Sequence, residues 1–228
     1  MCVSAEVSFG MASLLAAGGI FSVYKASKTD MRYVPLALFP IFVAVQQMLE
    51  GFVWIGVESS VFYLRMAALG YLFFAWIVWP SFVPYMTAKL EEEPRRKKIL
   101  LNFAQAGFLL GLILYLPNFW HPEWLNVEII NRSIAYKCTL ITDNIMPKTV
   151  TYLFYLSMIG LPPLLSSHRA LNIFGAGLIA AVPLTYFFFS YAHVSVLCFF
   201  AALMTLYIIY VILEDKCEAR SFMALSKT

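Results

Sequence analysis

Long apolar runs constrain this chain more than any other feature of its sequence. In residues 61–88, Arg65 is the one charged residue. A helix needs about 20 predominantly apolar residues to cross the hydrocarbon core of a bilayer. Over the whole chain 61% of residues are hydrophobic and 13% are charged, whereas roughly a quarter of the residues of a soluble domain are charged. The composition predicts an all-α integral membrane protein.

Seven segments are long and apolar enough to be candidate transmembrane helices. We expect them at about 8–24, 34–57, 61–88, 99–116, 149–165, 171–190 and 193–213. Because they follow one another with few interruptions, we expect 1–228 to form a single seven-helix membrane domain. Residues 1–9 lack the basic start of a secretory signal, and Lys25, Lys28 and Arg32 follow the first run as a stop-transfer flank, so the first helix is expected to remain.

The first run is the shortest and is rich in small residues. Gly18 and Gly19 accompany Ala12 and Ala16, which are four residues apart. Small residues at this spacing let helices approach closely in lipid. We therefore expect the first helix to pack inside the bundle.

The distribution of Lys and Arg predicts the orientation, because basic residues concentrate in cytoplasmic loops. With seven spans, one side of the membrane holds twelve of the sixteen: Lys25, Lys28, Arg32, Lys89, Arg95, Arg96, Lys97, Lys98, Arg169, Lys216, Arg220 and Lys227. The other side holds Arg65, Arg132, Lys137 and Lys148. We therefore expect the N-terminus outside and the C-terminus in the cytoplasm.

The charged run KLEEEPRRKK, residues 89–98, then lies at the inner leaflet. Its basic half could contact anionic lipid headgroups. A solvated loop that only sets the topology is the favoured alternative, since its acidic half offsets its basic half.

The same topology leaves one long loop outside, 117–147. It contains VEIINRSIAYKCTLI, whose branched and aromatic residues favour a short hairpin over the bundle. The hairpin could be a lid over an outward-facing cavity or a passive cap. Cys138 in this loop and Cys2 in the N-terminal tail both fall outside, where a disulfide between them could form in an oxidising compartment.

A polar face interrupts the second apolar run. The segment FVAVQQMLEGFVW, residues 42–54, places Gln46, Gln47, Glu50 and Trp54 on one side of a helix. An acidic residue at the centre of a transmembrane helix costs about 2.5 to 3.5 kcal/mol, so it faces the protein interior or a water-filled cavity. Glu50 is therefore either a functional carboxylate or a protonated structural one bonded to Gln47.

Two further side chains could join this face near the outer surface. Glu6 precedes the first apolar run and His193 opens the seventh, so with Glu50 they could line one outward-facing pocket. Such groups could ligate a divalent metal or hold a water for general-base attack. The sequence has no HExxH, no paired-cysteine motif and no glycine-rich phosphate loop, and no case for nucleic acid arises.

Several segments resemble an uncharacterised bacterial family of small polytopic membrane proteins. They are the start MCVSAEVSF, the pair RYVPLALFP and QQMLEGFVW, and YLFFAWIVWPSFVP, which together lie within roughly the first 90 residues. Val3 stands where the family commonly has phenylalanine. The family is a domain of unknown function, so the resemblance implies a location in the bacterial inner membrane and no activity.

Three functional hypotheses remain from the sequence. The first is a binding or transport protein that takes a small ligand, an ion or a lipid headgroup at Glu50. The second is a membrane-embedded hydrolase or metalloenzyme that uses Glu6, Glu50 and His193, and the third is a scaffold subunit of a membrane complex. The sequence names no cofactor and no oligomeric state, and leaves open whether the protein is an enzyme.

Overall fold

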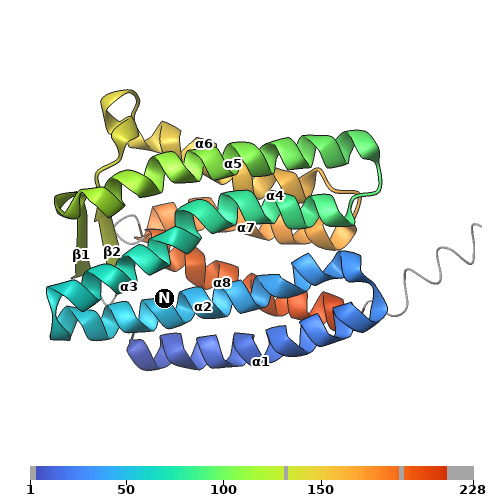
Figure 1. Ribbon diagram of the computed structural model, residues 1–228, viewed down its shortest axis with the longest axis horizontal. Helices are drawn as coiled ribbons and strands as arrows, with labels where there is room; N and C mark the ends of the chain where they lie inside the picture. The colour runs from blue at the N-terminus through green and yellow to red at the C-terminus, as the bar shows by residue number, and fades with distance from the viewer. Residues whose placement is uncertain (1–3, 131–132, 190–192, 215–228) are drawn as a thin grey trace, which may run out of the picture.

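The fold was analysed in a computed structural model, and it is mostly helical (Figure 1). The structure describes residues 4–130, 133–189 and 193–214, and the side chains of 58, 59, 61, 183–189 and 193–199 fall outside this description. The α-helices are α1 (Ala5–Thr29), α2 (Val34–Ser59), α3 (Val61–Phe73), α4 (Trp79–Leu90), α5 (Pro94–Trp120), α6 (Lys148–Leu164), α7 (Arg169–Phe189) and α8 (His193–Glu214). A π-helical turn, η2 (Phe74–Val78), joins α3 to α4, and the strands are β1 (Leu125–Ile130) and β2 (Ser133–Cys138).

Four helical segments are long and apolar enough to cross a membrane: Ala5–Thr29, Met31–Val57, Phe62–Leu90 and Pro94–Trp120. Two shorter apolar helical segments, Arg169–Val182 and Phe200–Glu214, accompany them. These segments indicate an integral membrane protein embedded in a lipid bilayer. That the chain crosses the membrane seven times, and that residues 1–228 form a single membrane domain, stay predictions.

The π-helical turn marks the point where α5 comes closest to the α3–α4 segment. Pro80, two residues after the turn, has no backbone N–H to donate to the helical hydrogen-bond ladder. A π-helical turn is a local change of hydrogen-bond pattern that accommodates this missing bond. The carbonyl of Ala75, inside the turn, accepts a hydrogen bond from the Tyr155 hydroxyl of α6. Gly107 and Gly111 of α5 lie directly against the backbone carbonyls of Pro80 and Trp76. The turn thus ties α5 and α6 to the same stretch of chain.

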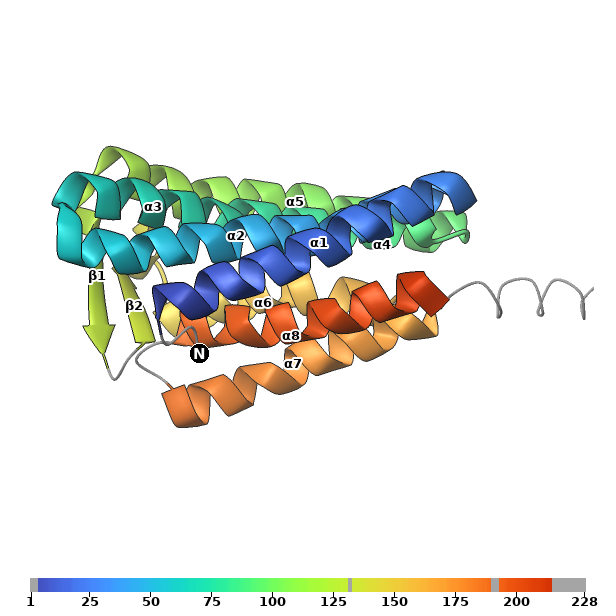
Figure 2. The ribbon, with the colours of Figure 1, turned by 90° about the horizontal axis from the view of Figure 1, so that it is seen from below.

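The helices lie along one long axis and the connections between them gather at its two ends (Figures 1 and 2). The hairpin and the beginnings of α1 and α3 lie at one end. The α1–α2, α4–α5 and α6–α7 connections lie at the other, where side chains link them: Arg32 pairs with Glu92 at 2.7 Å, and Arg96 donates to Ser167 Oγ at 3.2 Å. We call the first the hairpin end and the second the basic end.

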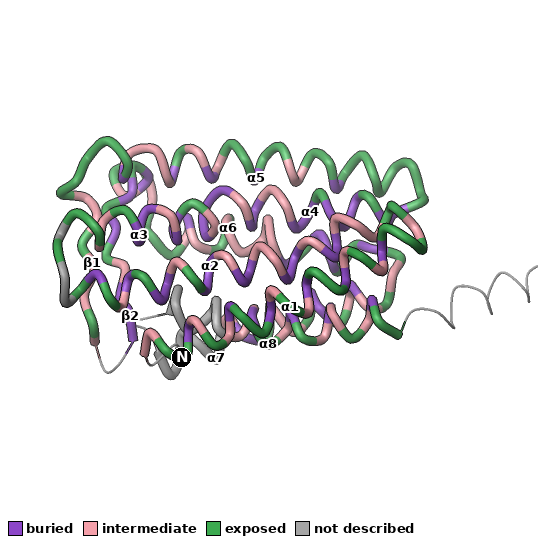
Figure 3. Tube along the Cα trace, turned by 60° about the horizontal axis from the view of Figure 1, so that its bottom comes forward, coloured by how far each residue is buried: buried purple, intermediate pink, exposed green. Residues whose placement is uncertain are grey.

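The position of α1 differs from the expectation that its small residues would place it inside the bundle. It lies at the edge, and only six of its 25 residues are buried (Figure 3). Its buried residues form one narrow stripe: Ser8, Ala12, Leu15, Gly19, Ser22 and Ala26. Along this stripe a side chain at Gly19 would meet Ile41 and Pro40 of α2. The small residues therefore allow one face to pack closely, which a peripheral helix needs as much as a central one.

The hairpin expected in the long loop is confirmed. β1 and β2 pair antiparallel, with Leu125 opposite Cys138 and Ile130 opposite Ser133. No residue of β1 is fully buried, whereas Ile134 and Ala135 of β2 are buried. The loop is shorter than expected at its start, since α5 continues to Trp120 rather than ending at 116.

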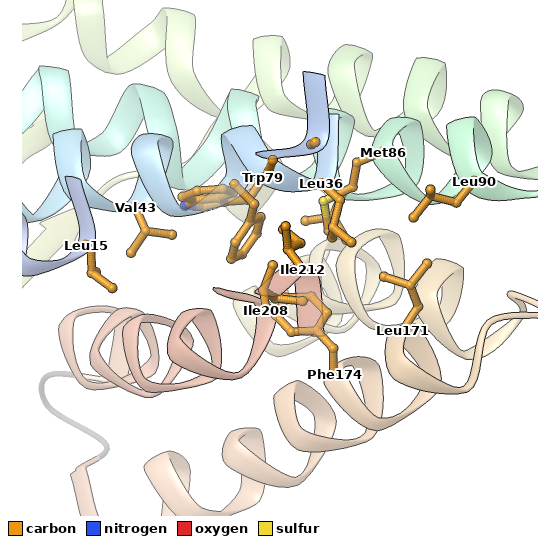
Figure 4. Close-up of a cluster of buried hydrophobic side chains, with 14 of the residues drawn as sticks. Leu15, Leu36, Val43, Trp79, Met86, Leu90, Leu171, Phe174, Ile208 and Ile212 are labelled. Carbon is orange, nitrogen blue, oxygen red and sulfur yellow. The ribbon is translucent and has the colours of Figure 1, made fainter. Parts of the chain in front are cut away.

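The main hydrophobic core lies between the helices in the half of the bundle nearer the basic end. Figure 4 shows its side chains, contributed by α1, α2, α4, α7 and α8. Phe39 of α2 packs against both Trp79 of α4 and Phe174 of α7, with ring centroids 5.0 and 5.2 Å apart. This core brings Trp79 beside the polar residues of α2.

Candidate functional site

Three polar side chains of α2 are buried together inside the bundle. Gln46 is 2% exposed, and Gln47 and Glu50 are 0% exposed. The Gln47 amide Nε2 donates to Glu50 Oε2 at 3.2 Å. The predicted polar face of α2 therefore points toward the protein interior. This is expected, because a charged side chain exposed to lipid would cost free energy. We call Gln46, Gln47 and Glu50 the polar cluster.

A tryptophan from α4 joins the polar cluster. Its indole Nε1 donates to Gln46 Oε1 at 2.7 Å, so Trp79 satisfies one acceptor inside the membrane core. Trp79 follows the π-helical turn directly. Sequence reasoning missed this residue because its partner lies 33 positions earlier in the chain; the one available signal was an indole N–H in an apolar run, which needs an acceptor when buried.

The glycine next to Glu50 lets α1 approach the polar cluster. A side chain at Gly51 would lie 2.7 Å from the ring of Phe9. Phe9 also makes an edge-to-face contact with Phe52, with ring centroids 5.3 Å apart. The Gln-Gln-x-x-Glu-Gly element thus combines a polar face with a site at which α1 packs.

Trp54 lies one turn from Glu50 toward the hairpin end and is half-buried. It packs against the cluster formed by Val53, Ala67, Ala68 and Ile134. Its Nε1 is buried without a hydrogen-bond partner among the described residues. Strand β2, through Ile134, therefore covers the turn of α2 that lies between Glu50 and the hairpin end.

A small apolar cavity of about 70 Å³ lies on the other side of Trp79. It is lined by Phe39, Trp79, Val83, Tyr155, Leu156, Ile159, Gly160, Leu178, Ile179, Val182 and Ala201. Pockets for drug-sized ligands measure about 300 to 1,000 Å³. This cavity is therefore suited to a small apolar group, and Gln46, Gln47 and Glu50 are not among its lining residues.

The structure does not bring all the predicted site residues together. Glu6 is exposed in the first turn of α1, whereas Glu50 is fully buried. His193 begins α8, and its side chain falls outside the described residues. Among the side chains that are described, no three His, Cys, Asp or Glu residues lie close enough to hold a metal ion.

Cys138 ends β2 as a buried thiol. Burial raises the pKa of this thiol to about 12, against a smaller opposite effect of the Lys148 charge. Lys148 Nζ also donates to the Cys138 carbonyl at 2.9 Å. Cys2 lies outside the described residues, so the disulfide between the two cysteines stays a prediction.

A second buried carboxylate lies at the basic end. Glu91, in the α4–α5 connection, is 2% exposed. It accepts hydrogen bonds from Ser167 N and Ser167 Oγ, both at 2.8 Å, and His168 Nε2 lies 2.9 Å from the Leu90 carbonyl. Burial raises the pKa of Glu91, but the bonds from Ser167 and Glu93 and the nearby His168 outweigh it, so the pKa is below its ordinary value. Glu91 therefore ties the α4–α5 connection to the α6–α7 connection.

Comparison with known proteins assigns a family without an activity. A search of curated proteins and a search of solved structures both found no match. A family model described as "Family of unknown function (DUF6629)" matches residues 1–222, well beyond the first 90 residues that carried the resemblance in the sequence. The chain, with its mostly helical fold and its four long apolar helices, therefore belongs to the DUF6629 family.

Proposed function

We propose that this chain is a seven-helix membrane protein that binds a small cation, or the cationic group of a small ligand, at Glu50. The single observation that carries the proposal is the burial of a carboxylate together with two glutamines inside the helix bundle. Apolar residues of similar volume would fill this space at lower energy, since buried ionic groups seldom stabilise a fold better than apolar packing. An acceptor-rich cluster in this position is well suited to a positively charged ligand.

The proposed orientation has the N-terminus outside and the C-terminus in the cytoplasm of a bacterium, in its inner membrane. The basic end collects Lys28, Arg32, Lys89, Arg95, Arg96, Lys97 and Lys98, which supports placing that end inside. In this orientation the ligand approaches Glu50 from the outer surface. Strand β2 then acts as a lid that must shift before the ligand enters, because Ile134 packs over the outer turn of α2.

The packing around the polar cluster favours a small ligand. Gln46, Gln47 and Glu50 are at most 2% exposed, so the cluster is closely packed and offers little room for a phospholipid headgroup with its glycerol. An ion or a small amine needs less room, and the Gln47 amide lies beside the carboxylate. The structure offers no specific observation that favours the hydrolase or scaffold alternatives.

The experiment measures thermal unfolding of the purified protein in detergent, with sodium, potassium, calcium and ethanolammonium chlorides compared at constant ionic strength. A ligand that binds only the folded state raises the free energy of unfolding, by about 2.7 kcal/mol when its concentration is 100 times Kd. Tm therefore rises with ligand concentration. We expect one of these cations to raise the Tm of the wild type and to have no effect on Glu50→Gln.

Glu92→Gln is the matched control, because it removes the same charge from a side chain that is 77% exposed. It should keep the full response. Glu6→Gln tests whether the exposed carboxylate at the start of α1 contributes. An identical cation response in wild type and Glu50→Gln, or no response in the wild type to any of the four, would contradict the proposal.

A further inference from the structure

We propose that the groove between α4 and α5 is a binding site for one anionic phospholipid of the inner leaflet. The groove has a volume of about 530 Å³, in the range of ligand-sized sites, and is open on the side away from the bundle core. Its lining comes from η2 and α4 (Ile77, Val78, Ser81, Phe82, Tyr85) and from α5 (Leu101, Ala104, Gln105, Phe108). The site is separate from the polar cluster around Glu50.

The shape of the groove follows from the crossing of its two helices. α5 touches the α3–α4 segment most closely where Gly107 and Gly111 meet the carbonyls of Pro80 and Trp76. From there toward the basic end both helices carry larger side chains, among them Tyr85 and Leu101. The two helices therefore enclose an elongated, mostly apolar furrow that suits an acyl chain.

Positive charge lies at the basic end of this furrow. On α4, Lys89 follows Tyr85 by one turn, and its Nζ lies 5.2 Å from the centre of the Tyr85 ring. On α5, Lys97 is exposed and precedes Leu101 by four residues, which places it on the groove face. A phosphate between these two lysines would be held from both helices at the level of the headgroups.

A polar side chain lies within the groove itself. Gln105 is exposed, and its amide makes no hydrogen bond to any described residue. At eight residues from Lys97 it lies about 12 Å deeper along α5. An amide that faces lipid at this depth needs a partner. The ester carbonyls of a glycerophospholipid lie just below its phosphate and accept hydrogen bonds. The Gln105 side chain leans toward the N-terminus of α5, and therefore toward these carbonyls, so that its amide can donate to them.

Charge and groove together select the ligand. A zwitterionic lipid could fill the furrow, but its positive headgroup would face Lys89 and Lys97. Two other cations nearby are engaged elsewhere: Arg96 donates to Ser167, and Arg32 pairs with Glu92. An anionic lipid is attracted by about 1 kcal/mol for each basic residue near the surface, a factor of about five in affinity.

The experiment adds phosphatidylglycerol or phosphatidylcholine with identical acyl chains to the delipidated full-length protein in a neutral detergent. Native mass spectrometry counts retained lipid and thermal unfolding measures the shift in Tm. We expect one phosphatidylglycerol to be retained with a raised Tm, and phosphatidylcholine to be retained at least tenfold more weakly. Equal retention of the two lipids, or an equal effect of soluble glycerol phosphate, would overturn the proposal.

Variants locate the site. Ala104→Trp fills the groove and should abolish retention, whereas Ala106→Trp adds the same bulk at an exposed position outside the lining and should leave it unchanged. Lys89→Gln with Lys97→Gln should weaken phosphatidylglycerol binding about 25-fold.

Two further variants serve as controls. Lys28→Gln with Arg95→Gln removes two exposed charges from the same end and should cost less than threefold. Gln105→Leu serves as a mild variant that keeps the fold and should weaken retention severalfold. Retention of phosphatidylglycerol that is unaffected by Ala104→Trp and by Gln105→Leu would refute the site. Glu50→Gln should leave this retention unchanged.

Discussion

The close crossing of α4 and α5 predicts a large effect of a single methyl group at Gly107. A Cβ atom at this position would lie 1.9 Å from the Pro80 carbonyl oxygen and 3.2 Å from Pro80 Cβ. The obstacle is backbone, so no rotamer change can relieve it. The two helices must separate by at least about 1 Å at this point, because contacts of a real Cβ below 3.0 Å are essentially never seen.

The expected magnitude combines two opposing effects. Overpacking a well-packed site costs about 1 to 3 kcal/mol and sometimes more. Alanine in place of glycine in a helix interior gains up to about 1 kcal/mol. Since the clash at Gly107 is with a carbonyl and is severe, we expect Gly107→Ala to lower the free energy of unfolding by about 2 kcal/mol or more.

The assay is unfolding in mixed detergent micelles, with helicity as the signal, for wild type and two alanine variants. Gly10→Ala is the control, because a Cβ there meets nothing within 4 Å and should leave stability unchanged or slightly raised. Gly160→Ala should fall between them, since its Cβ would meet only side-chain atoms of Ile179, at 2.7 Å. A Gly107→Ala protein as stable as the wild type would refute the described helix crossing.

Two further predictions concern groups outside the helices. Glu91→Gln should destabilise the protein at neutral pH by about 2 kcal/mol, since it removes a charged acceptor of the Ser167 bonds, whereas Glu92→Gln should change little. Because folding lowers the pKa of Glu91, the contribution of its carboxylate to the free energy of unfolding is complete above about pH 5 and disappears as the pH falls through the folded-state pKa. A difference in Tm between wild type and Glu91→Gln that does not change with pH would contradict this. Cys138 should react slowly with a maleimide at pH 7 in a folded Cys2→Ser variant and rapidly after denaturation, because its thiol is buried and its pKa is raised. Mass spectrometry of the labelled peptide measures the rate, and rapid labelling of Cys138 in the folded protein would contradict its burial.

The sequence was sufficient for features that depend on local periodicity. Apolar runs predicted the long helices, and the branched and aromatic residues of VEIINRSIAYKCTLI predicted a hairpin, which is observed at 125–138. The spacing of Gln46, Gln47 and Glu50 placed them on one face, and all three are buried. Each of these inferences compares residues within a few turns or strands of one another, where backbone geometry alone decides which side chains share a face.

Contacts between distant segments could not be predicted in the same way. The Trp79–Gln46 hydrogen bond depends on how α4 is rotated against α2, and that rotation is set by the π-helical turn at Phe74–Val78. Small residues at four-residue spacing in α1 correctly indicate close packing. They do not tell whether the opposite face meets protein or lipid, because both surroundings are apolar.

Glu50 and Glu91 show why composition alone misjudges charged residues in a membrane protein. Glu50 stood out because its neighbours in the chain are apolar, whereas Glu91 belongs to a charged run that is typical of a solvated loop. Both are almost completely buried. The burial of Glu91 comes from the α6–α7 connection, which is 76 residues away in the chain and supplies Ser167. A carboxylate in a charged connection can therefore be as much a part of the packed protein as one inside a helix. Fixed backbone and hydroxyl donors make Glu91 a structural tie. Glu50 is buried beside the Gln47 amide, and this supports the proposal that it binds a cation.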